Sequence, residues 1–304
     1  MKKLAILTSH VIQYQTPFFR KLAAHPDIDL TVYFCWDFGA RKTFDVQFGT
    51  HVEWDIPLLG GYRHVFLKNL SLKPSSDFWG QVNPSIIREL RRGRYDAVLV
   101  YGWNSLTNWL AFFTAFTRRI PVFLHGESPW SQERTKSWLN RRMKQVVLGW
   151  LFIRVSAFPY IGEENRKFYK KYGVPDKKLF FAPYAVDNER FMAESDKLAL
   201  RKSDYKCELG VAPDQPVILF VGKFIDKKRP FDLLKAFELL TSHYTLHPKP
   251  YLLFVGDGEL RPALEAYTKE HGLKNVHFVG FKNQTELPKY YTLADIFVLP
   301  SGIG

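Results

Sequence analysis

The basic loop after Gly222 offers the clearest chemistry in this sequence. Lys223, Lys228 and Arg229 lie in this loop, directly after an apolar run of strand type. Cations held at the end of a strand can stabilise the negative charge that builds on a departing phosphate oxygen, and they act more on the transition state than on the ground state. A solvated basic turn has the same composition, but the strands around this loop favour phosphate binding. We therefore expect Lys223 and Lys228 to be catalytic cations.

One further stretch could bind the rest of an anionic ligand. Ser301 and Gly302 follow another apolar run, where the next helix would begin. A glycine-rich helix start offers backbone N–H groups to a phosphate, although a serine with glycines is also typical of a flexible tail. We expect an incomplete anion site at residues 301–304, because the chain ends before the helix that would complete it.

The first half of the chain holds a separate set of polar candidates. His125 closes an apolar run, and Glu127 follows two positions later. A single histidine at a strand end is either a hydrogen-bonded structural residue or a ligand contact, and both interpretations stay open. Earlier in the chain, His10, Gln13 and Tyr14 follow the first apolar run and could line a pocket.

Other familiar catalytic patterns are absent from the sequence. No spacing indicates a Ser–His–Asp triad, a His-Glu-x-x-His metal site or a P-loop. The stretch Gly256-Asp257-Gly258 lacks the third glycine of a dinucleotide-binding fingerprint, and we interpret it as a tight structural turn.

Apolar runs of strand type position these candidates. In the second half they alternate with helical segments and occur at residues 217–222, 251–255, 276–280 and 296–300. Such alternation indicates a parallel sheet with right-handed crossovers, in which ligands bind at the carboxyl ends of the strands. We therefore expect Lys223, Gly256, Gly280 and Ser301 to share one edge of a sheet.

The first half has its own series of strands and helices. Its expected strands are residues 4–10, 30–34, 64–67, 96–102, 121–127, 157–161 and 178–184. Thr16 is expected to cap a helix that Pro17 opens, and residues 36–61 read as a long covering loop. The predicted fold is α/β, GT-B-like in having two Rossmann-like doubly wound domains that face across a cleft. We place the domains at residues 1–190 and 216–304, the second of them incomplete, with a linker at 191–215 that holds a short helix.

The second half resembles the donor domain of family 4 glycosyltransferases, which have the GT-B fold. The matching stretches are Gly222-Lys223-Phe224-x3-Lys228 and residues 254–258, 279–281 and 294–301, with a weaker likeness at 9–18 and 184–191. In that family the last stretch leads into a Glu-x7-Glu motif, and this chain ends at Gly304 before either glutamate. The resemblance implies a transferase that is truncated within its donor domain.

The resemblance also implies roles for the candidate residues. The donor would be bound by Gly222, Lys223, Lys228, Arg229, Val279, Gly280, Phe281, Ser301 and Gly302. His125 would be catalytic together with Lys223 and Lys228 and would contact the transferred sugar. The acceptor side would be formed by His10, Gln13, Tyr14 and Glu127. The implied reaction is a retaining transfer from a nucleotide diphosphate-sugar to a glycan or lipid-linked acceptor, as in polysaccharide biosynthesis. It would need no metal or other cofactor, because lysines do the electrostatic work.

Composition and charge limit the partners and the location. The net charge is +13, and residues 1–190 hold 28 Lys and Arg against 16 Asp and Glu. No nucleic-acid recognition motif accompanies this excess, so we expect no nucleic-acid partner. The basic, aromatic stretch 138–154 is either a membrane-surface helix or a core helix. No apolar stretch reaches the roughly 18–20 residues needed to span a bilayer, and we expect a cytoplasmic protein that could lie peripherally on the inner face of the membrane.

Two alternatives to the transferase stay open. A sugar-nucleotide epimerase shares the two-domain architecture and changes its substrate without any acceptor. A non-catalytic binding protein would fit a donor site that the chain leaves incomplete.

Overall fold

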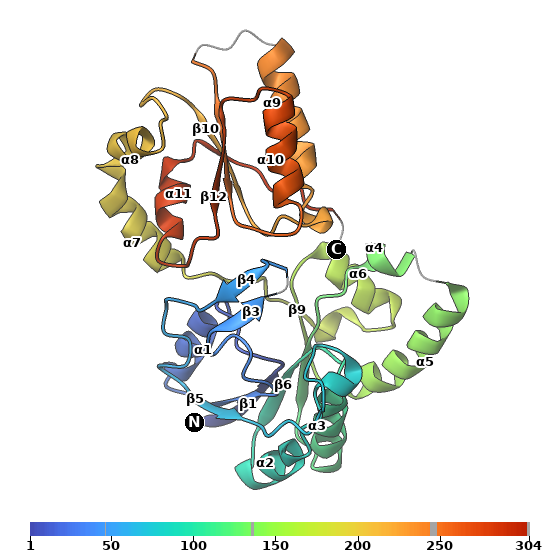
Figure 1. Ribbon diagram of the computed structural model, residues 1–304. Helices are drawn as coiled ribbons and strands as arrows, with labels where there is room; N and C mark the ends of the chain where they lie inside the picture. Colours follow the sequence, from blue (N-terminus) through green and yellow to red (C-terminus); the bar gives the residue numbers. More distant parts are fainter. Residues whose placement is uncertain (46, 135–136, 244–247, 303–304) are drawn as a thin grey trace. The chain divides into compact units, whose positions relative to one another are not determined.

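The computed structural model describes residues 1–45, 47–134, 137–243 and 248–302, and it divides into two compact units (Figure 1). The first unit comprises Met1–Arg41 and Pro57–Val186, and the second comprises Lys42–Ile56 and Asp187–Gly304. The chain therefore leaves the first unit at Lys42, returns to it at Pro57, and leaves it again after Val186. Residues 42–56 belong to the second unit, whereas the sequence predicts them in the first domain.

The first unit is built on a five-stranded parallel sheet with the order β5-β2-β1-β6-β7. The strands are β1 (Lys2–Thr8), β2 (Ile28–Phe34), β5 (Arg63–Phe66), β6 (Ala97–Tyr101) and β7 (Val122–His125). The helices are α1 (Thr16–Ala23), α2 (Ser85–Gly93), α3 (Leu106–Thr117), α4 (Trp130–Arg134), α5 (Trp138–Arg154) and α6 (Glu163–Lys171). The predicted strand–helix alternation is confirmed for these elements.

Two details of this unit differ from expectation. Thr16 is the first residue of α1 rather than its cap, and Gln15 is the capping residue. The hydroxyl of Thr16 instead donates to the carbonyl of Leu58, because the buried side chain finds its partner in a distant loop. The expected strands 157–161 and 178–184 shorten to β8 (Phe158–Tyr160) and β9 (Leu179–Phe181), which form a separate two-stranded sheet.

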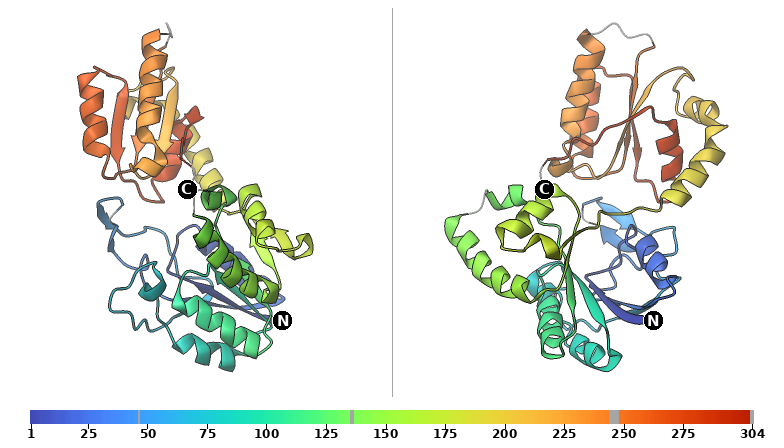
Figure 2. Two further views of the ribbon diagram at one scale, coloured as in Figure 1. Left: turned by 90° about the vertical axis from the view of Figure 1, so that its right-hand side faces the viewer. Right: turned by 180° about the vertical axis from the view of Figure 1, so that it is seen from behind.

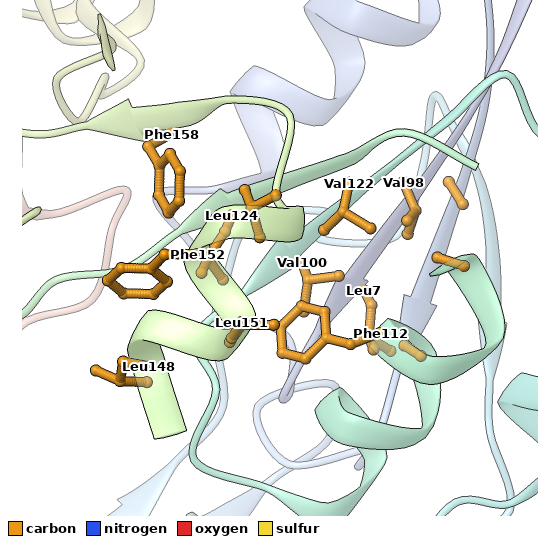
Figure 3. Close-up of a cluster of buried hydrophobic side chains, with 14 of the residues drawn as sticks. Leu7, Val98, Val100, Phe112, Val122, Leu124, Leu148, Leu151, Phe152 and Phe158 are labelled. Carbon is orange, nitrogen blue, oxygen red and sulfur yellow. The ribbon is translucent and has the colours of Figure 1, made fainter. Parts of the chain in front are cut away.

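Side chains of α3 and α5 fill the core on one face of this sheet. Leu151 and Phe152 of α5 and Phe112 of α3 point toward Val100 and Leu124 on the strands (Figure 3). All five are at most 3% exposed, and burying each contributes roughly 1.5–3 kcal/mol relative to leaving it in water. This core fixes the end of β7 at His125 and the start of the following loop, which carries Glu127.

The second unit is built on a four-stranded parallel sheet with the order β12-β11-β10-β13. The strands are β10 (Val217–Val221), β11 (Tyr251–Val255), β12 (Val276–Gly280) and β13 (Ile296–Phe297). Helices α9 (Pro230–His243) and α10 (Arg261–Glu270) cover one face, and α11 (Leu287–Leu293) covers the other (Figures 1 and 2). Neighbouring residues of β10 show the two-sided burial, since Leu219 joins the cluster with Leu293 while Phe220 joins the cluster with Leu234.

The segment expected as a linker is mostly helical. Residues 191–215, predicted as a hinge with one short helix, lie largely in α7 (Asn188–Ala199) and α8 (Lys202–Glu208). Both helices belong to the second unit: the hydroxyls of Ser195 and Thr292 are 2.8 Å apart, and Lys202 Nζ donates to Asp295 at 3.0 Å. Polar residues at the surface of two docked helices gave the segment its linker-like composition.

The expected long loop at 36–61 also contains regular structure. A β-hairpin is formed by β3 (Thr43–Asp45) and β4 (Thr50–Val52), and residue 46 lies outside the described residues. We call residues 42–56 the inserted hairpin, because they lie between β2 and β5 in the sequence and belong to the second unit.

Candidate functional site

The carboxyl edge of the second sheet brings together the loops predicted to share it. Gly222 N donates to Val255 O at 3.0 Å, and Gly256 N donates to Gly280 O at 2.9 Å. The loops after β10, β11 and β12 are therefore joined side by side by backbone hydrogen bonds. Gly302 N donates to Lys227 O at 2.9 Å, which brings the segment after β13 to the same loop as the lysines.

Gly256 permits this close approach of neighbouring loops. Its φ is +139°, and a Cβ there would collide with the carbonyl oxygen of Gly222. Only glycine adopts such a conformation without strain and leaves room for the neighbouring backbone. The structural role expected for the Gly-Asp-Gly turn is therefore supported at this position.

Lys228 is the half-buried cation of the loop after β10. It ends a short 3₁₀ turn, Asp226–Lys228, and its ammonium has no hydrogen-bond or ion-pair partner in the described part of the chain. Burial lowers the pKa of Lys228, and the charges of Lys227 and Lys223 lower it further. An ammonium that is crowded by like charge and lacks a carboxylate partner is suited to receive an anionic ligand.

Lys223 is bound by the inserted hairpin. Its Nζ donates to both carboxylate oxygens of Asp45, at 3.2 and 3.0 Å, and to Gln47 Oε1 at 2.8 Å. The ammonium also lies 4.6 Å from the centre of the Phe48 ring. The two catalytic lysines predicted from the sequence therefore share one loop but differ in state, since Lys223 is paired and Lys228 is not.

The other predicted donor residues also lie along this edge. Arg229 has φ +50° and forms an ion pair with Asp232 at the start of α9. Ser301 is exposed and Gly302 half-buried, and residues 303–304 of the predicted anion site lie outside the described residues. Val279 and Gly280 end β12, and the ring of Phe281 lies 5.0 Å from that of Phe48.

Sequence reasoning missed several residues at this edge. Asp45, Gln47 and Phe48 come from the inserted hairpin, and Arg261 comes from the start of α10. Arg261 Nη1 pairs with Asp257 at 2.7 Å and would lie 3.3 Å from a Cβ on Gly280. Residues 45 and 47–49 carry a turn signal, since Asp45 accepts from the backbone of Gln47 and Phe48 and Gly49 has φ +66°.

A second group of predicted residues meets at the carboxyl edge of the first sheet. His125 ends β7, is 6% exposed, and has ring contacts with Tyr101 at 4.7 Å and Tyr184 at 5.6 Å. Burial lowers the pKa of His125 below its ordinary value, and the Glu127 carboxylate opposes part of that shift. His125 Nδ1 is buried and has no hydrogen-bond partner among the described residues. A neutral imidazole with a free ring nitrogen can exchange one hydrogen bond with a ligand hydroxyl.

Tyrosines surround the nearby carboxylate. The Tyr184 hydroxyl donates to Glu127, and Tyr14 packs edge-on against Tyr184 at 5.2 Å. Burial and the Glu127 charge raise the pKa of Tyr14 and of Tyr184, so both phenols stay protonated as donors. Tyr184 and Tyr101 were not among the predicted site residues.

Two predicted acceptor residues lie on the loop between β1 and α1. His10 shares a hydrogen bond of 2.9 Å with Ser9 and contacts the rings of Trp36 and Phe38. Burial lowers the pKa of His10 as well. Gln13 is half-buried on the same loop. The structure therefore joins His125, Glu127 and Tyr14 in one cluster, while the ring contacts of His10 are with other residues.

The described residues were also searched for metal sites and membrane spans. Residues 1–45, 47–134, 137–243 and 248–302 contain no group of three or more His, Cys, Asp and Glu side chains placed to hold a metal ion. Within the same ranges, no helix combines the length and the apolar character needed to cross a bilayer.

Residues 202–303 match the model of the protein family described as glycosyl transferases group 1. A GDP-mannose-dependent alpha-(1-6)-phosphatidylinositol monomannoside mannosyltransferase from Mycolicibacterium smegmatis is 27% identical over 188 residues, which are 61% of this chain and 45% of the relative. The matched segments span between 23% and 45% of the length of the curated relatives.

Almost the whole chain can be superimposed on solved structures that have the same fold. Anabaena HepE in complex with UDP and glucose matches with a TM-score of 0.66 at 16% identity, over 99% of this chain and 74% of HepE. UDP-GlcNAc 2-epimerase from Neisseria meningitidis, bound to UDP-GlcNAc, matches with a TM-score of 0.57 at 17% identity, over 98% and 76% of the two chains. The predicted α/β, GT-B-like fold is confirmed by this likeness and by the parallel sheets of both units.

Proposed function

We propose that this protein is a retaining glycosyltransferase of family 4 that moves a sugar from a nucleotide diphosphate-sugar to a hydroxyl group of a glycan or lipid-linked acceptor. The observation that carries the proposal is the cationic loop at the carboxyl edge of a sheet whose residues match a glycosyltransferase family. A lipid-linked acceptor is favoured by the relative from Mycolicibacterium smegmatis, whose name specifies a phosphatidylinositol mannoside.

The lysines would act on the leaving group. Cleavage between the anomeric carbon and the diphosphate leaves negative charge on a phosphate oxygen, and Lys228 lies half-buried with a free ammonium on the loop that also carries Lys223. Fixed cations that meet this charge as it develops stabilise the transition state, and losing one such group costs about 10²–10³ in kcat in other enzymes. We propose that Lys228, Lys223 and the backbone N–H of Ser301 do this without a metal, while the N–H of Gly302 holds the segment to the carbonyl of Lys227.

The carboxyl edge of the first sheet would bind the uncharged parts of the donor and the acceptor. His125 offers a free ring nitrogen, and the phenols of Tyr14 and Tyr184 donate beside the Glu127 carboxylate. Hydroxyl groups of sugars both donate and accept hydrogen bonds, so a neutral histidine next to a carboxylate suits them. We propose that His125 contacts the transferred sugar and that Glu127 and Tyr14 contact the acceptor.

A transfer assay tests the proposal. Purified protein is incubated with UDP- or GDP-sugars and an extracted glycolipid acceptor, and the product is identified by mass spectrometry and by NMR of the anomeric proton. The expected result is a glycosylated acceptor with the configuration of the donor retained. The double variant Lys223→Ala, Lys228→Ala is expected to lose turnover by at least about 10²-fold; full activity in that variant would overturn the assigned mechanism.

An epimerase is the second candidate, because a UDP-GlcNAc 2-epimerase has the same fold over 98% of this chain. The same incubation without an acceptor separates the two candidates. An epimerase converts the free sugar nucleotide into its epimer, whereas a transferase leaves the sugar nucleotide intact or hydrolyses it slowly. Formation of the epimer in the absence of acceptor would replace the transferase proposal.

We further propose that the protein acts on the cytoplasmic surface of an anionic membrane, through α5. The helix buries one face and leaves an apolar stripe on the opposite one, formed by Leu139, Met143, Val146, Trp150 and Ile153. These residues recur every three or four positions, so they lie in one line along the helix. They are 37–77% exposed, and the guanidinium of Arg154 stacks over Trp150 at 4.2 Å.

Apolar side chains with basic neighbours are typical of helices that lie on anionic lipid surfaces. The alternative of a core helix is favoured only for the opposite face, where Leu148, Leu151 and Phe152 are buried. Sedimentation with vesicles tests the stripe: we expect binding to phosphatidylglycerol-containing vesicles and much weaker binding to neutral ones. The variant Val146→Glu should reduce it, and the matched variant Leu72→Glu, which makes the same change of charge at an exposed position outside α5, should not. Equal binding to both kinds of vesicle would contradict the proposal.

A further inference from the structure

The tip of the inserted hairpin occupies the ammonium of Lys223. Three oxygen atoms, two from Asp45 and one from Gln47, lie within 3.2 Å of Lys223 Nζ. An ammonium has three protons to donate, so these acceptors match its full capacity. Only 18% of the Asp45 side chain and 25% of the Lys223 side chain are exposed. A phosphate oxygen could bind Lys223 only by displacing one of these partners.

The segment that follows β4 in the inserted hairpin is held by a different loop. Asn283 Nδ2 donates to Glu53 O at 2.5 Å, and Thr285 N donates to both carboxylate oxygens of Asp55 at 3.2 Å. These contacts anchor the hairpin to the loop after β12 and leave Lys223 out. Release of Lys223 by Asp45 and Gln47 would therefore leave the contacts of Glu53 and Asp55 intact, and Phe48 has its own contact with Phe281.

We propose that Asp45 and Gln47 form an internal ligand of Lys223, which the diphosphate of the donor displaces, so that Asp45 sets the affinity of the site for diphosphates. The inference rests on the proposed transferase function and adds a specificity-determining residue to it. The Asp45 carboxylate binds the Lys223 ammonium as a phosphate group would, because both groups are negatively charged and both accept hydrogen bonds through oxygen. A ligand that meets only Lys228 leaves the hairpin in place, whereas one that spans both lysines must compete with Asp45.

This competition has a measurable size. When a site is open only part of the time, the apparent dissociation constant rises by the inverse of the open fraction. A partly buried, doubly hydrogen-bonded ion pair keeps the site closed most of the time, and its removal is expected to tighten diphosphate binding roughly five- to tenfold. The gain should be confined to ligands that reach Lys223.

Calorimetry on the full chain with UDP, GDP and UMP tests the inference. Asp45→Asn is the informative variant, because its side-chain oxygen can still accept from the backbone of Gln47 and Phe48 and so preserves the turn. Glu53→Gln is the matched control: it removes the same charge from the same hairpin, and its exposed side chain is not on Lys223. We expect Asp45→Asn to lower the Kd of the preferred diphosphate roughly five- to tenfold, with Glu53→Gln at the wild-type value and UMP nearly unchanged in both.

Hydrogen exchange of the wild type gives a second, independent readout. Addition of the diphosphate should speed exchange at residues 43–52, as the tip is released, and slow exchange at residues 222–229, where the ligand binds. Slower exchange at 43–52 on ligand binding would overturn the inference, because the hairpin would then close over the ligand. Clear binding with equal Kd in wild type and Asp45→Asn would overturn the internal ligand alone. Absence of nucleotide binding in both proteins would overturn the donor site and this inference together.

Discussion

The two sheets end in edges of opposite chemical character. At the edge of the second sheet the loop after β10 carries Lys223 and Lys228, and Arg261 adds a third cation beside Gly280. At the edge of the first sheet burial keeps His125 neutral, and a tyrosine hydroxyl donates to Glu127. Both edges are carboxyl ends of parallel strands flanked by helices, so the fold alone does not set the chemistry. The loops decide whether an edge attracts charge or hydroxyl groups.

Each edge also leaves one polar group without a partner in the described part of the chain. On the second sheet that group is the Lys228 ammonium, and on the first it is His125 Nδ1. Buried polar atoms almost always have a hydrogen-bond partner, and among the described residues His125 Nδ1 is an exception together with His64 Nδ1, Ser85 Oγ and Arg141 Nε. Lys228 is half-buried, and its unpaired ammonium is open to an anionic ligand. One is a charged donor and the other a neutral ring nitrogen. The proposed transfer needs both, a cation for the departing diphosphate and a neutral partner for the sugar hydroxyls.

The largest effect is expected from Lys228→Ala. Removing the free ammonium should lower kcat about 10²–10³-fold, because Lys223 is then the only lysine that meets the charge on the leaving phosphate. Lys227→Ala is the control, since Lys227 is exposed and adjacent and contributes only its backbone carbonyl to the site. Initial rates at saturating donor give the comparison, and similar losses in the two variants would mean that loop charge in general, rather than the unpaired lysine, matters.

A smaller effect is expected at the other edge. His125→Ala should lower kcat/KM for the sugar nucleotide roughly 5- to 30-fold, the size of one lost hydrogen bond of about 1–2 kcal/mol. The Kd of UDP, which lacks the sugar, should stay at the wild-type value. Partial rescue by His125→Gln would indicate a hydrogen bond rather than packing against Tyr101 and Tyr184. A higher Kd of UDP in His125→Ala would contradict the proposal that UDP is bound at the edge of the second sheet and the sugar at the edge of the first.

The carboxyl edge of the second sheet could be predicted from the sequence, because the residues that form it are set by short stretches of the chain. An apolar run such as residues 251–255 fixes a strand, Gly256 fixes the turn after it, and parallel order brings the loop ends together. The lysine loop follows the same logic, since its place depends only on β10 and on Pro230 at the start of α9. The first edge was partly predicted, with His125 and Glu127 named and Tyr184 missed.

The inserted hairpin could not be predicted, because its determinants are distant. Asp45 and Lys223 are 178 positions apart, and strands of three residues are too short to show a period. Its aromatic and glycine content was typical of an irregular loop. The prediction of a linker at residues 191–215 was wrong for a related reason. The packing of α7 and α8 depends on distant contacts, such as the one between Ser195 and Thr292 of α11. Non-local pairing decides both cases, and no window of sequence contains it.

The smallest effect expected is a difference in pH response between the two edges. Burial holds the pKa of His125, like that of His10, below the ordinary value of 6.5, so the unfolded chain binds protons that the folded first unit does not. Stability linked to these histidines is therefore fully present above pH 6.5 and falls as pH drops from 6.5 through their lowered pKa values. Between pH 7 and pH 5 the Tm of His125→Gln should fall less than that of the wild type. The Tm of Lys228→Ala should fall by the same amount as that of the wild type over this range. A Tm loss as large in His125→Gln as in the wild type would show that the imidazole is not kept neutral by burial, and the contrast between a charged and a neutral edge would fail.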